Sequence, residues 1–457
     1  MSNLFISASV LAAVCAVSNP DSAQTPADLT GHWEGRIAFG GQSLRVVFRV
    51  DDTGQTVMDS PDQGARGIPV QGPTVEGGVV RFLVPAIGGR FEGTRSEDGK
   101  TLTGVLSQGG VTLPLVLAHS AATVEVVSRP QTPKPPFPYR SEDVTIDNPA
   151  APGVRLGATL TLPAGEGPFP AAVLITGTGP QDRDETILDH KPFAVWADAL
   201  TRRGIAVLRY DDRGVAGSTG DFAAATGVDF ASDAKAAFDW LKTRPEVDPA
   251  RIGMIGHSEG GVFAPIAVQQ GADPAWMVML AGPAASGAEI IQEQQRRFTT
   301  AAGAAPEVVE EGNRLQRRFM AAVVANADDG EAVRREVTAI ALENGATPDA
   351  AARTGAQMSN AWYRGYIAHD PAESLRTLRI PLLAVYGEKD LQVPASQNAP
   401  LMRQYRPDAD VVVLPGLNHL FQPATTGLMT EYGQIETTLD PSVISTVVDW
   451  VVKTTAR

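Results

Sequence analysis

The sequence predicts an α/β fold, in which a mostly parallel β-sheet is flanked by helices, with a small all-β domain in front of it. Between about residues 29 and 117, apolar and polar residues alternate in short runs separated by turns rich in Gly and Asp, which is typical of antiparallel strands. Further along, apolar runs of four or five residues alternate with helical stretches, as in a parallel sheet covered on both faces. The five prolines within 129–138 favour a linker between the two parts.

Composition and charge limit the classes of protein to which the chain can belong. Its 457 residues suffice for two or three folded units. Hydrophobic residues make up 43% and charged residues 20%, as in a compact globular protein rather than a disordered one. The formal net charge of −14 repels nucleic acid and anionic lipid. We therefore expect a small-molecule partner, no nucleic acid and no stable membrane insertion.

The start of the chain is predicted to be a secretory signal peptide. An apolar run over 4–17 is followed by a polar stretch, and cleavage is expected near Ala16 or Ala23. No Lys or Arg precedes Arg36, so the usual basic start is missing, and an apolar tail is the alternative. The only cysteine, Cys15, lies in this segment, so the mature chain would have no disulfide and no cysteine-ligated metal. A periplasmic or secreted protein is expected.

The predicted boundaries divide the chain into four segments. They are a signal peptide at 1–23, an all-β domain at 29–125, a proline-rich linker at 126–140, and an α/β domain at 141–457 with a helical cap at about 285–379. The cap is inferred because that stretch has no strand-like run and several amphipathic helical ones. Six to eight strands are expected in the all-β domain, around a barrel or sandwich core that contains Trp33, Phe48, Phe82 and Phe91.

Individual strands are predicted from the apolar runs. In the all-β domain the clearest lie at 44–50 and 79–84. In the α/β domain they lie at 171–175, 206–210, 252–255, 277–280, 382–386 and 411–414. The strand at 252–255 leads directly into the strongest motif of the chain.

That motif is Gly-His-Ser-Glu-Gly at 256–260, a G-x-S-x-G sequence between the strand and a predicted helix at 261–268. In this context the serine occupies a very tight turn that has room only for glycine on both sides, and its hydroxyl is exposed at a helix N-terminus. The pattern predicts Ser258 as the nucleophile of a hydrolase with the α/β-hydrolase fold. The amide of Glu259 is expected to face a developing oxyanion.

The general base and the acid are predicted from their places along the chain. A serine hydroxyl needs a separate imidazole, and His419 follows the last predicted strand, where this fold carries its base. His257 is expected to point away from Ser258 and to pack beside the turn. The acid is expected after the penultimate strand. There Asp390 is favoured over Glu388, because the turn that follows it packs a hydrophobic residue and fixes its carboxylate.

The loop at 176–185, Thr-Gly-Thr-Gly-Pro-Gln-Asp-Arg-Asp-Glu, is predicted to complete the oxyanion hole. Thr178 is the expected amide donor opposite Glu259. The Gly-Thr-Gly run also suggests a dinucleotide site, but the third glycine is absent and the acidic residues that follow would repel a phosphate. After the next strand, Asp212 and Arg213 are expected to belong to a buried or half-buried ion pair that holds the loop, with a role as substrate ligands as the alternative.

Five motifs together resemble a known family. They are the loop at 176–185, Arg-Tyr-Asp-Asp-Arg-Gly-Val at 209–215, the serine motif at 256–260, Tyr-Gly-Glu-Lys-Asp at 386–390 and Gly-Leu-Asn-His-Leu-Phe-Gln at 416–422. In these, the chain resembles the bacterial α/β-hydrolase carboxylesterases grouped with the serine aminopeptidase-like (S33-type) hydrolases. The resemblance covers about 130–450. One departure is Thr178, which replaces the serine usual in that loop.

The resemblance implies hydrolysis of carboxylic esters, with short chains preferred, through an acyl-enzyme on Ser258. No metal or other cofactor is needed for this chemistry. It also implies that the segment 362–371 closes the cap, so Trp362, Tyr363 and Tyr366 are candidate substrate-binding residues, with plain packing inside the cap as the alternative.

Two other functions stay open. A serine peptidase or aminopeptidase would use the same three residues, and comparing esters with peptides would separate it from an esterase. A non-catalytic ligand-binding protein would act through its all-β domain and would leave Ser258, Asp390 and His419 without a role. The all-β domain itself carries no nucleophile and base pair, and it is expected to shape or cover the entrance to the site.

Overall fold

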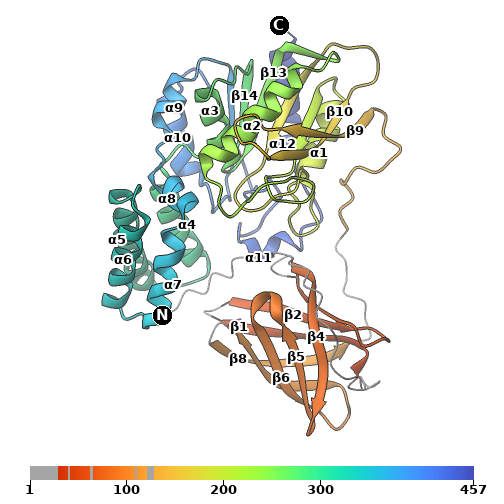
Figure 1. Cartoon of the computed structure of the whole chain (residues 1–457), viewed down its shortest axis with the longest axis vertical. Coiled ribbons are helices and arrows are strands. Elements are labelled where there is room, and N and C mark those ends of the chain that lie inside the picture. Colours follow the sequence, from red (N-terminus) through yellow and green to blue (C-terminus); the bar gives the residue numbers. More distant parts are fainter. Residues whose placement is uncertain (1–28, 40–41, 62–64, 109–110, 121–127, 457) are drawn as a thin grey trace. The chain divides into compact units, whose positions relative to one another are not determined.

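Figure 1 shows the computed structural model of the chain, whose described residues are 29–39, 42–61, 65–108, 111–120 and 128–456. The chain divides into two compact units, one built around the all-β domain and the other around the α/β domain. The predicted signal peptide at 1–23 lies outside the described residues. Among the helices that the structure describes, none has both the length and the apolar character needed to cross a bilayer.

The N-terminal unit is a closed barrel. Its elements are β1 (Gly31–Phe39), β2 (Gln42–Val50), β3 (Thr56–Ser60), β4 (Ala65–Glu76), β5 (Val79–Val84), the 3-10 turn η3 (Pro85–Ile87), β6 (Gly89–Arg95), β7 (Thr101–Gln108) and β8 (Val111–Ser120). Each strand pairs antiparallel with the next, and β1 pairs with β8 to close the ring. Closure leaves no unpaired sheet edge.

Aromatic side chains fill the barrel core. Trp33, Phe48, Phe82 and Phe91 are all fully buried, as predicted. Phe48 stacks on Phe82 with a distance of 4.4 Å between the ring centroids. An eight-stranded barrel has an interior just wide enough for side chains to fill, so the barrel, and not the sandwich alternative, accommodates this core.

The second unit is built on one eight-stranded sheet. Its strands are β9 (Arg140–Asp147), β10 (Arg155–Leu162), β11 (Phe169–Ile175), β12 (Ala206–Tyr210), β13 (Val247–His257), β14 (Trp276–Leu280), β15 (Leu382–Gly387) and β16 (Asp410–Leu414). Their order in space is β9-β10-β12-β11-β13-β14-β15-β16. From β12 to β16 all neighbours are parallel, whereas β10 is antiparallel to both β9 and β12. The predicted α/β-hydrolase fold with an all-β domain in front is confirmed.

Helices cover both faces of the sheet (Figure 1). Outside the cap they are α1 (Pro192–Thr201), α2 (Gly227–Lys242), α3 (Gly260–Gln269), α10 (Ala395–Tyr405) and α12 (Pro441–Thr455). The short helix α11 (Met429–Tyr432) groups with the barrel unit instead. The chain moves outward from β11 to β12 through α1, and then back past β11 to β13 through α2. Because parallel crossovers are right-handed, these opposite movements place α1 and α2 on opposite faces. Ligands bind at such a reversal, beyond the carboxyl ends of the strands.

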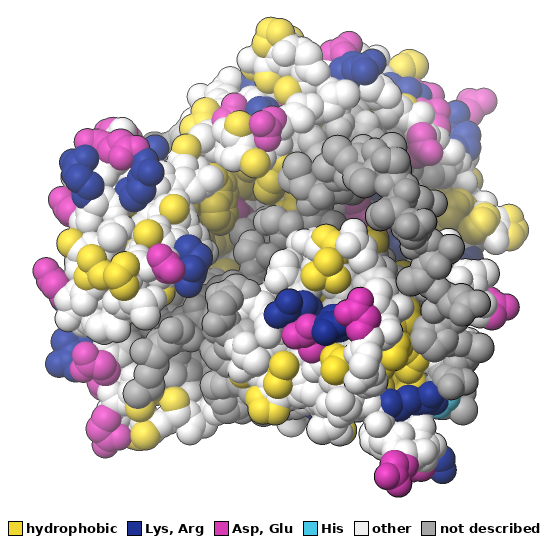
Figure 2. All heavy atoms as spheres, turned by 60° about the horizontal axis from the view of Figure 1, so that its bottom comes forward, with side chains coloured by type: hydrophobic (Ala, Val, Ile, Leu, Met, Phe, Trp, Pro, Cys, Tyr) yellow, Lys and Arg dark blue, Asp and Glu magenta, His cyan; other side chains and the backbone are white. Residues whose placement is uncertain are grey.

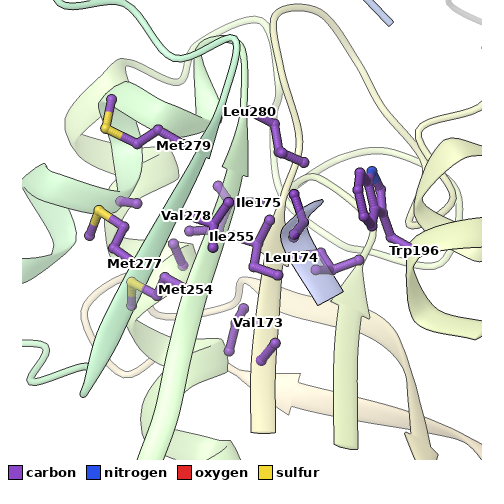
Figure 3. Packing of buried hydrophobic residues seen from close by; sticks show 14 of the residues in the cluster. Val173, Leu174, Ile175, Trp196, Met254, Ile255, Met277, Val278, Met279 and Leu280 are labelled. Carbon is purple, nitrogen blue, oxygen red and sulfur yellow. The ribbon is translucent and has the colours of Figure 1, made fainter. Parts of the chain in front are cut away.

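The central strands are fixed by a layer of apolar side chains. In Figure 3, residues 173–175 of β11, Met254 and Ile255 of β13, and residues 277–280 of β14 pack together, with Trp196 of α1 beside them. All of these side chains are buried. The core sets the register of β11 against β13, so that the loops leaving the two strands start side by side.

The predicted cap is helical throughout. It consists of α4 (Gly287–Ala301), α5 (Pro306–Ala325), α6 (Gly330–Glu343), α7 (Pro348–Met358), α8 (Ala361–Ala368) and α9 (Ala372–Thr377). Phe319, Val333 and Ile367 belong to a small apolar core of its own. A Cβ atom on Gly287 would lie 1.8 Å from the carbonyl oxygen of Tyr366, so α4 and α8 cross at a distance that only glycine allows.

Much of the proline-rich segment belongs to the α/β unit. The guanidinium of Arg129 donates to the carbonyl of Leu188 at 3.0 Å. The side chain of Gln131 donates to the carbonyl of Leu439 at 2.7 Å and accepts from the amides of Thr438 and Leu439 at 2.6 and 2.9 Å. The segment predicted as a linker is therefore tied to the α/β unit from residue 129 onwards.

Surface charges lie in small mixed groups on the face shown in Figure 2. In the barrel, for example, Arg81 forms ion pairs with Glu76 and Glu92, both at 2.8 Å. Exposed pairs of this kind contribute about 0–1 kcal/mol each. The buried apolar layers therefore carry most of the stability of each unit.

The contacts of Arg129 and Gln131 predict where the α/β unit begins. We expect a truncated chain that starts at Ser128 to unfold at a higher temperature than one that starts at Pro138, because each hydrogen bond lost contributes about 1 kcal/mol. Thermal unfolding followed by circular dichroism measures the difference. Equal midpoints for the two truncated chains would show that these contacts do not stabilise the unit.

Candidate active site

Ser258 lies in a left-handed turn between β13 and α3. Its φ is 51°, which costs a non-glycine residue roughly 1–3 kcal/mol and is found mainly at functional sites. A Cβ on Gly256 would lie 2.3 Å from the carbonyl oxygen of Gly260, and one on Gly260 would lie 2.2 Å from that of Ile175. The turn therefore requires both glycines of the motif. Ser258 itself is partly exposed.

His419 and Asp390 form a buried hydrogen-bonded pair. His419 follows β16 and Asp390 follows β15, and His419 Nδ1 lies 2.8 Å from Asp390 Oδ2. The other carboxylate oxygen accepts from the amides of Gln392 and Val393 at 2.7 and 2.9 Å. Since a carboxylate only accepts, Nδ1 carries the proton, and Nε2 is left with a free lone pair. This is the tautomer that a general base needs.

The rival carboxylate, Glu388, is exposed and accepts from the amide of Gly416 at 2.9 Å instead of contacting His419. Within the described residues, the Ser258 hydroxyl makes no hydrogen bond of its own. Catalytic hydrogen bonds are often long in unliganded enzymes and tighten when substrate binds. Ser258, His419 and Asp390 therefore all follow the carboxyl ends of parallel strands of the sheet. The hydrogen bond between His419 and Asp390 is formed, and the one between Ser258 and His419 is still to form.

The loop after β11 runs directly over the nucleophile. A Cβ on Gly177 would lie 3.1 Å from the Ser258 Cβ. The next residue, Thr178, is exposed. In the part of the chain that the structure describes, neither the Thr178 amide nor the Glu259 amide donates a hydrogen bond. Two free amides on either side of a serine are suited to receive an oxyanion.

Buried carboxyl groups hold this loop, although not in the predicted pairing. Asp212 accepts from the Thr176 hydroxyl at 2.8 Å and from the Gln181 amide at 2.9 Å. Burial raises the pKa of Asp212 well above its ordinary value. Arg213 does not pair with Asp212 but with Asp233, at 2.6 Å. The expected ion pair exists with a different acid, and Asp212 holds the loop through hydrogen bonds alone.

Glu259 joins the nucleophile turn to the cap. Its carboxyl group is buried and accepts from the Trp362 indole Nε1 at 2.8 Å. Burial raises its pKa to about 7, and hydrogen bonds from Thr178 and Trp362 oppose that rise. The Glu259 carboxyl is thus partly protonated near neutral pH, beside the nucleophile.

The three predicted substrate-binding aromatics all lie on α8, but in different surroundings. Trp362 packs against the core of the α/β unit, whereas Tyr363 and Tyr366 pack against the core of the cap. Tyr366 stacks on Trp362 with 5.9 Å between the ring centroids. Trp362 is therefore the aromatic residue of α8 that reaches the nucleophile turn, whereas Tyr363 and Tyr366 lie against the core of the cap.

Two neighbours of the site were not predicted as functional. His257 Nδ1 lies 2.8 Å from Glu185 Oε1, and His257 Nε2 lies 3.1 Å from the carbonyl oxygen of His419. Glu185 appeared in the sequence only as one of the acids of the loop at 176–185. A pairing across more than seventy residues has no local sequence signal that could have found it.

No group of three or more His, Cys, Asp or Glu side chains in the described residues is arranged to hold a metal ion. The His419–Asp390 pair and the two free amides beside Ser258 are groups that acyl transfer uses.

Comparison with known proteins identifies a matching family and a relative that is similar over most of the chain. Residues 152–420, more than half of the chain, match the family described as X-Pro dipeptidyl-peptidase (S15 family). Esterase EstD of Thermotoga maritima is 28% identical over 322 residues, which are 70% of this chain and 69% of the relative. The family match at 152–420 includes the nucleophile turn, the cap and His419.

Solved structures of low identity are also similar. The α/β-hydrolase GrgF of Penicillium sp. sh18 is 17% identical with a TM-score of 0.45, over 70% of this chain and 100% of that one. The esterase Pf2001 of Pyrococcus furiosus is 14% identical with a TM-score of 0.44, over 74% of this chain and 100% of that one. The fold assignment rests on the strand order given above and not on these likenesses.

The raised pKa of Glu259 predicts a pH-dependent cost to stability. A folded-state pKa above the ordinary 4.5 means that the contribution of this group is intact below pH 4.5 and is lost as the pH rises to about 7. The loss should reach on the order of 3 kcal/mol. We expect the unfolding free energy of Glu259→Gln, relative to that of wild type, to increase by that amount as the pH rises from 4.5 to 8. Urea unfolding across this range measures it, and a constant difference would show that Glu259 does not titrate there.

Proposed function

The chain belongs to the X-Pro dipeptidyl-peptidase (S15) family, and from this premise we propose that it is a serine hydrolase that cleaves carboxylic esters through an acyl-enzyme on Ser258. The observation that carries the proposal is the buried hydrogen bond between His419 and Asp390, at the sheet edge where Ser258 lies. Similarity to an esterase over 70% of the chain favours esters as substrates.

The proposed reaction is acyl transfer in two steps. His419 Nε2 takes the proton of the Ser258 hydroxyl as its oxygen attacks the ester carbonyl. The negative charge on the carbonyl oxygen is received by the amides of Thr178 and Glu259. The alcohol leaves with the proton from His419, and a water molecule, deprotonated by the same nitrogen, then releases the acid. Asp390 keeps the imidazole in the required tautomer and stabilises the imidazolium that forms in each step.

A serine peptidase is the second candidate, because the matching family is described as a dipeptidyl-peptidase. The same triad and oxyanion donors would serve an amide bond. Esters and amides with the same acyl group distinguish the two, since a peptidase cleaves the amide at a substantial rate as well as the ester, whereas an esterase cleaves only the ester well. The serine hydrolase chemistry is common to both.

We extend the proposal to the subfamily, the acyl-chain preference, the location of the protein and the role of the barrel. The motifs support a place among the S33-type esterases and a preference for short acyl chains. The apolar start of the chain supports a periplasmic or secreted location. We also propose that the barrel catalyses no reaction itself and that it influences the hydrolysis of bulky esters.

Labelling and triad variants test the proposal. A fluorophosphonate should label Ser258 because it combines a base with two oxyanion donors, and peptide mapping identifies the site. Ser258→Ala and His419→Ala should each lower kcat by about 10³-fold or more, and Asp390→Asn somewhat less. Glu388→Gln is the matched control and should leave kcat unchanged. A silent Asp390→Asn beside an impaired Glu388→Gln would show that the acid is misassigned, and labelling of another serine would reject Ser258.

Substitution on α8 tests the role of the cap. We expect Trp362→Ala to raise kcat/KM for long-chain esters relative to acetate esters by about tenfold, because it removes a large side chain that reaches the nucleophile turn. Tyr363→Phe, which removes only a hydroxyl, should leave the ratio unchanged. The measurement is kcat/KM for a series of p-nitrophenyl esters together with the thermal midpoint. A lower midpoint with an unchanged ratio would mean that Trp362 only packs.

A further inference from the structure

Glu185 and His257 connect three segments that converge on the nucleophile. Glu185 Oε1 accepts from the Gly177 amide and lies next to His257 Nδ1, both at 2.8 Å. The other nitrogen of His257 faces the backbone carbonyl of His419 at 3.1 Å. One acid and one imidazole thus join the oxyanion loop, the nucleophile turn and the loop of the base. Both side chains are buried.

The partners of His257 indicate its protonation state. A carbonyl oxygen can only accept, so His257 Nε2 must donate to His419. Glu185 Oε1 accepts from the Gly177 amide, and because a carboxylate can only accept, Nδ1 donates to it as well. An imidazole that donates from both nitrogens is an imidazolium. Burial lowers the pKa of His257, but Glu185 and the His419 carbonyl outweigh that effect, and the net pKa is raised.

The charged groups around the pair are few. Glu185 and the more distant Asp390 both attract the His257 cation. The ring of His419 lies 4.9 Å from that of His257, centroid to centroid. Asp212 acts on Glu185, but its own raised pKa keeps it protonated well above the usual range of a carboxyl. The Glu185–His257 pair therefore adds no net charge to the site when His257 is protonated.

We propose that Glu185 and His257 are positioning residues for the esterase reaction, and that they act as an ionised pair that holds the oxyanion loop and the catalytic histidine in place. Glu185 fixes the Gly177 amide, and with it the Thr178 amide that follows. His257 fixes the backbone of His419, so the distance between base and nucleophile depends on it. When His257 loses its proton, one of its two hydrogen bonds is lost and the site loosens. The proposal rests on the proposed function.

This role predicts a specific pH profile. In wild type, kcat/KM should fall at high pH as His257 loses its proton. Glu185→Gln removes the attraction that holds this proton, so the high-pH limb should move down by about one pH unit or more. The maximum should also fall, by up to about 10²-fold, because the loop and the base are misplaced. Glu246→Gln, at a carboxylate that pairs with Arg244 instead, is the matched control and should leave the high-pH limb unchanged.

A merely structural role gives a different outcome. If Glu185→Gln lowers kcat/KM equally at every pH without moving the high-pH limb, the proposal is wrong. Ester hydrolysis and the rate of fluorophosphonate labelling should be measured on the same samples. Failure of wild type to label at Ser258 would reject the proposed function, whereas labelling with an unmoved limb rejects only the role of the pair.

The protonation state can also be read on the wild-type protein, which keeps the test decisive if a variant fails to fold. With ¹⁵N-histidine labelling, His257 should show two N–H protons at pH 7.5, and its signals are assigned as those that disappear in His257→Gln or, failing that, by their contacts with the Gly177 and His419 backbone. A single N–H proton on His257 would show a neutral ring and overturn the proposal.

Discussion

The tight turn at Ser258 is the constraint on which the rest of the site depends. A serine with a positive φ at the end of a buried strand leaves no room for a Cβ on Gly256 or Gly260. The same lack of room brings the chain after β11 against the serine, because Gly260 lies on the carbonyl of Ile175. The positions of the proposed oxyanion donors, the Thr178 and Glu259 amides, are thereby set by the backbone. The reversal of strand order beside β11 lies next to this turn, and in open α/β sheets ligands bind at such reversals.

Buried acids around the turn show how environment separates groups of the same chemistry. Asp390 receives two backbone amides and an imidazole, which are the partners of a charged carboxylate. Glu259 receives an indole N–H and lies in a largely apolar setting, so its pKa rises to about 7. Asp212 is held by a hydroxyl and an amide, and its pKa rises well above the ordinary value. The site therefore contains acids suited to stay charged and acids suited to stay neutral.

The sequence predicted the fold because its strands and turns have local signals, and the triad remains a prediction whose members the structure places at the carboxyl ends of parallel strands. Alternating runs identified β2 and β5, apolar runs identified the parallel strands, and the glycines around Ser258 required one turn geometry. The strands β9 and β10 were missed, since the edge strand β9 is rich in polar residues and has no apolar run. Arg213 was assigned the wrong acid, and Glu185 was not paired with His257. Arg213 pairs with an acid of helix α2, and Glu185 with a residue at the end of β13, so neither contact follows from the local sequence pattern.

The cap has its own apolar core and enters the sheet through two adjacent strand ends, β14 and β15. An insertion with these properties can change its sequence, or be exchanged for another, without disturbing the strands that carry the serine, the acid and the histidine. Near Ser258 the cap contacts the rest of the unit through the short helix α8, where the Trp362 indole donates a hydrogen bond to the Glu259 carboxyl. Among relatives of this chain, we accordingly expect the sequence changes that alter substrate range to be concentrated in the insertion. Any replacement of the insertion must still provide the surface of α8 that contacts the nucleophile turn.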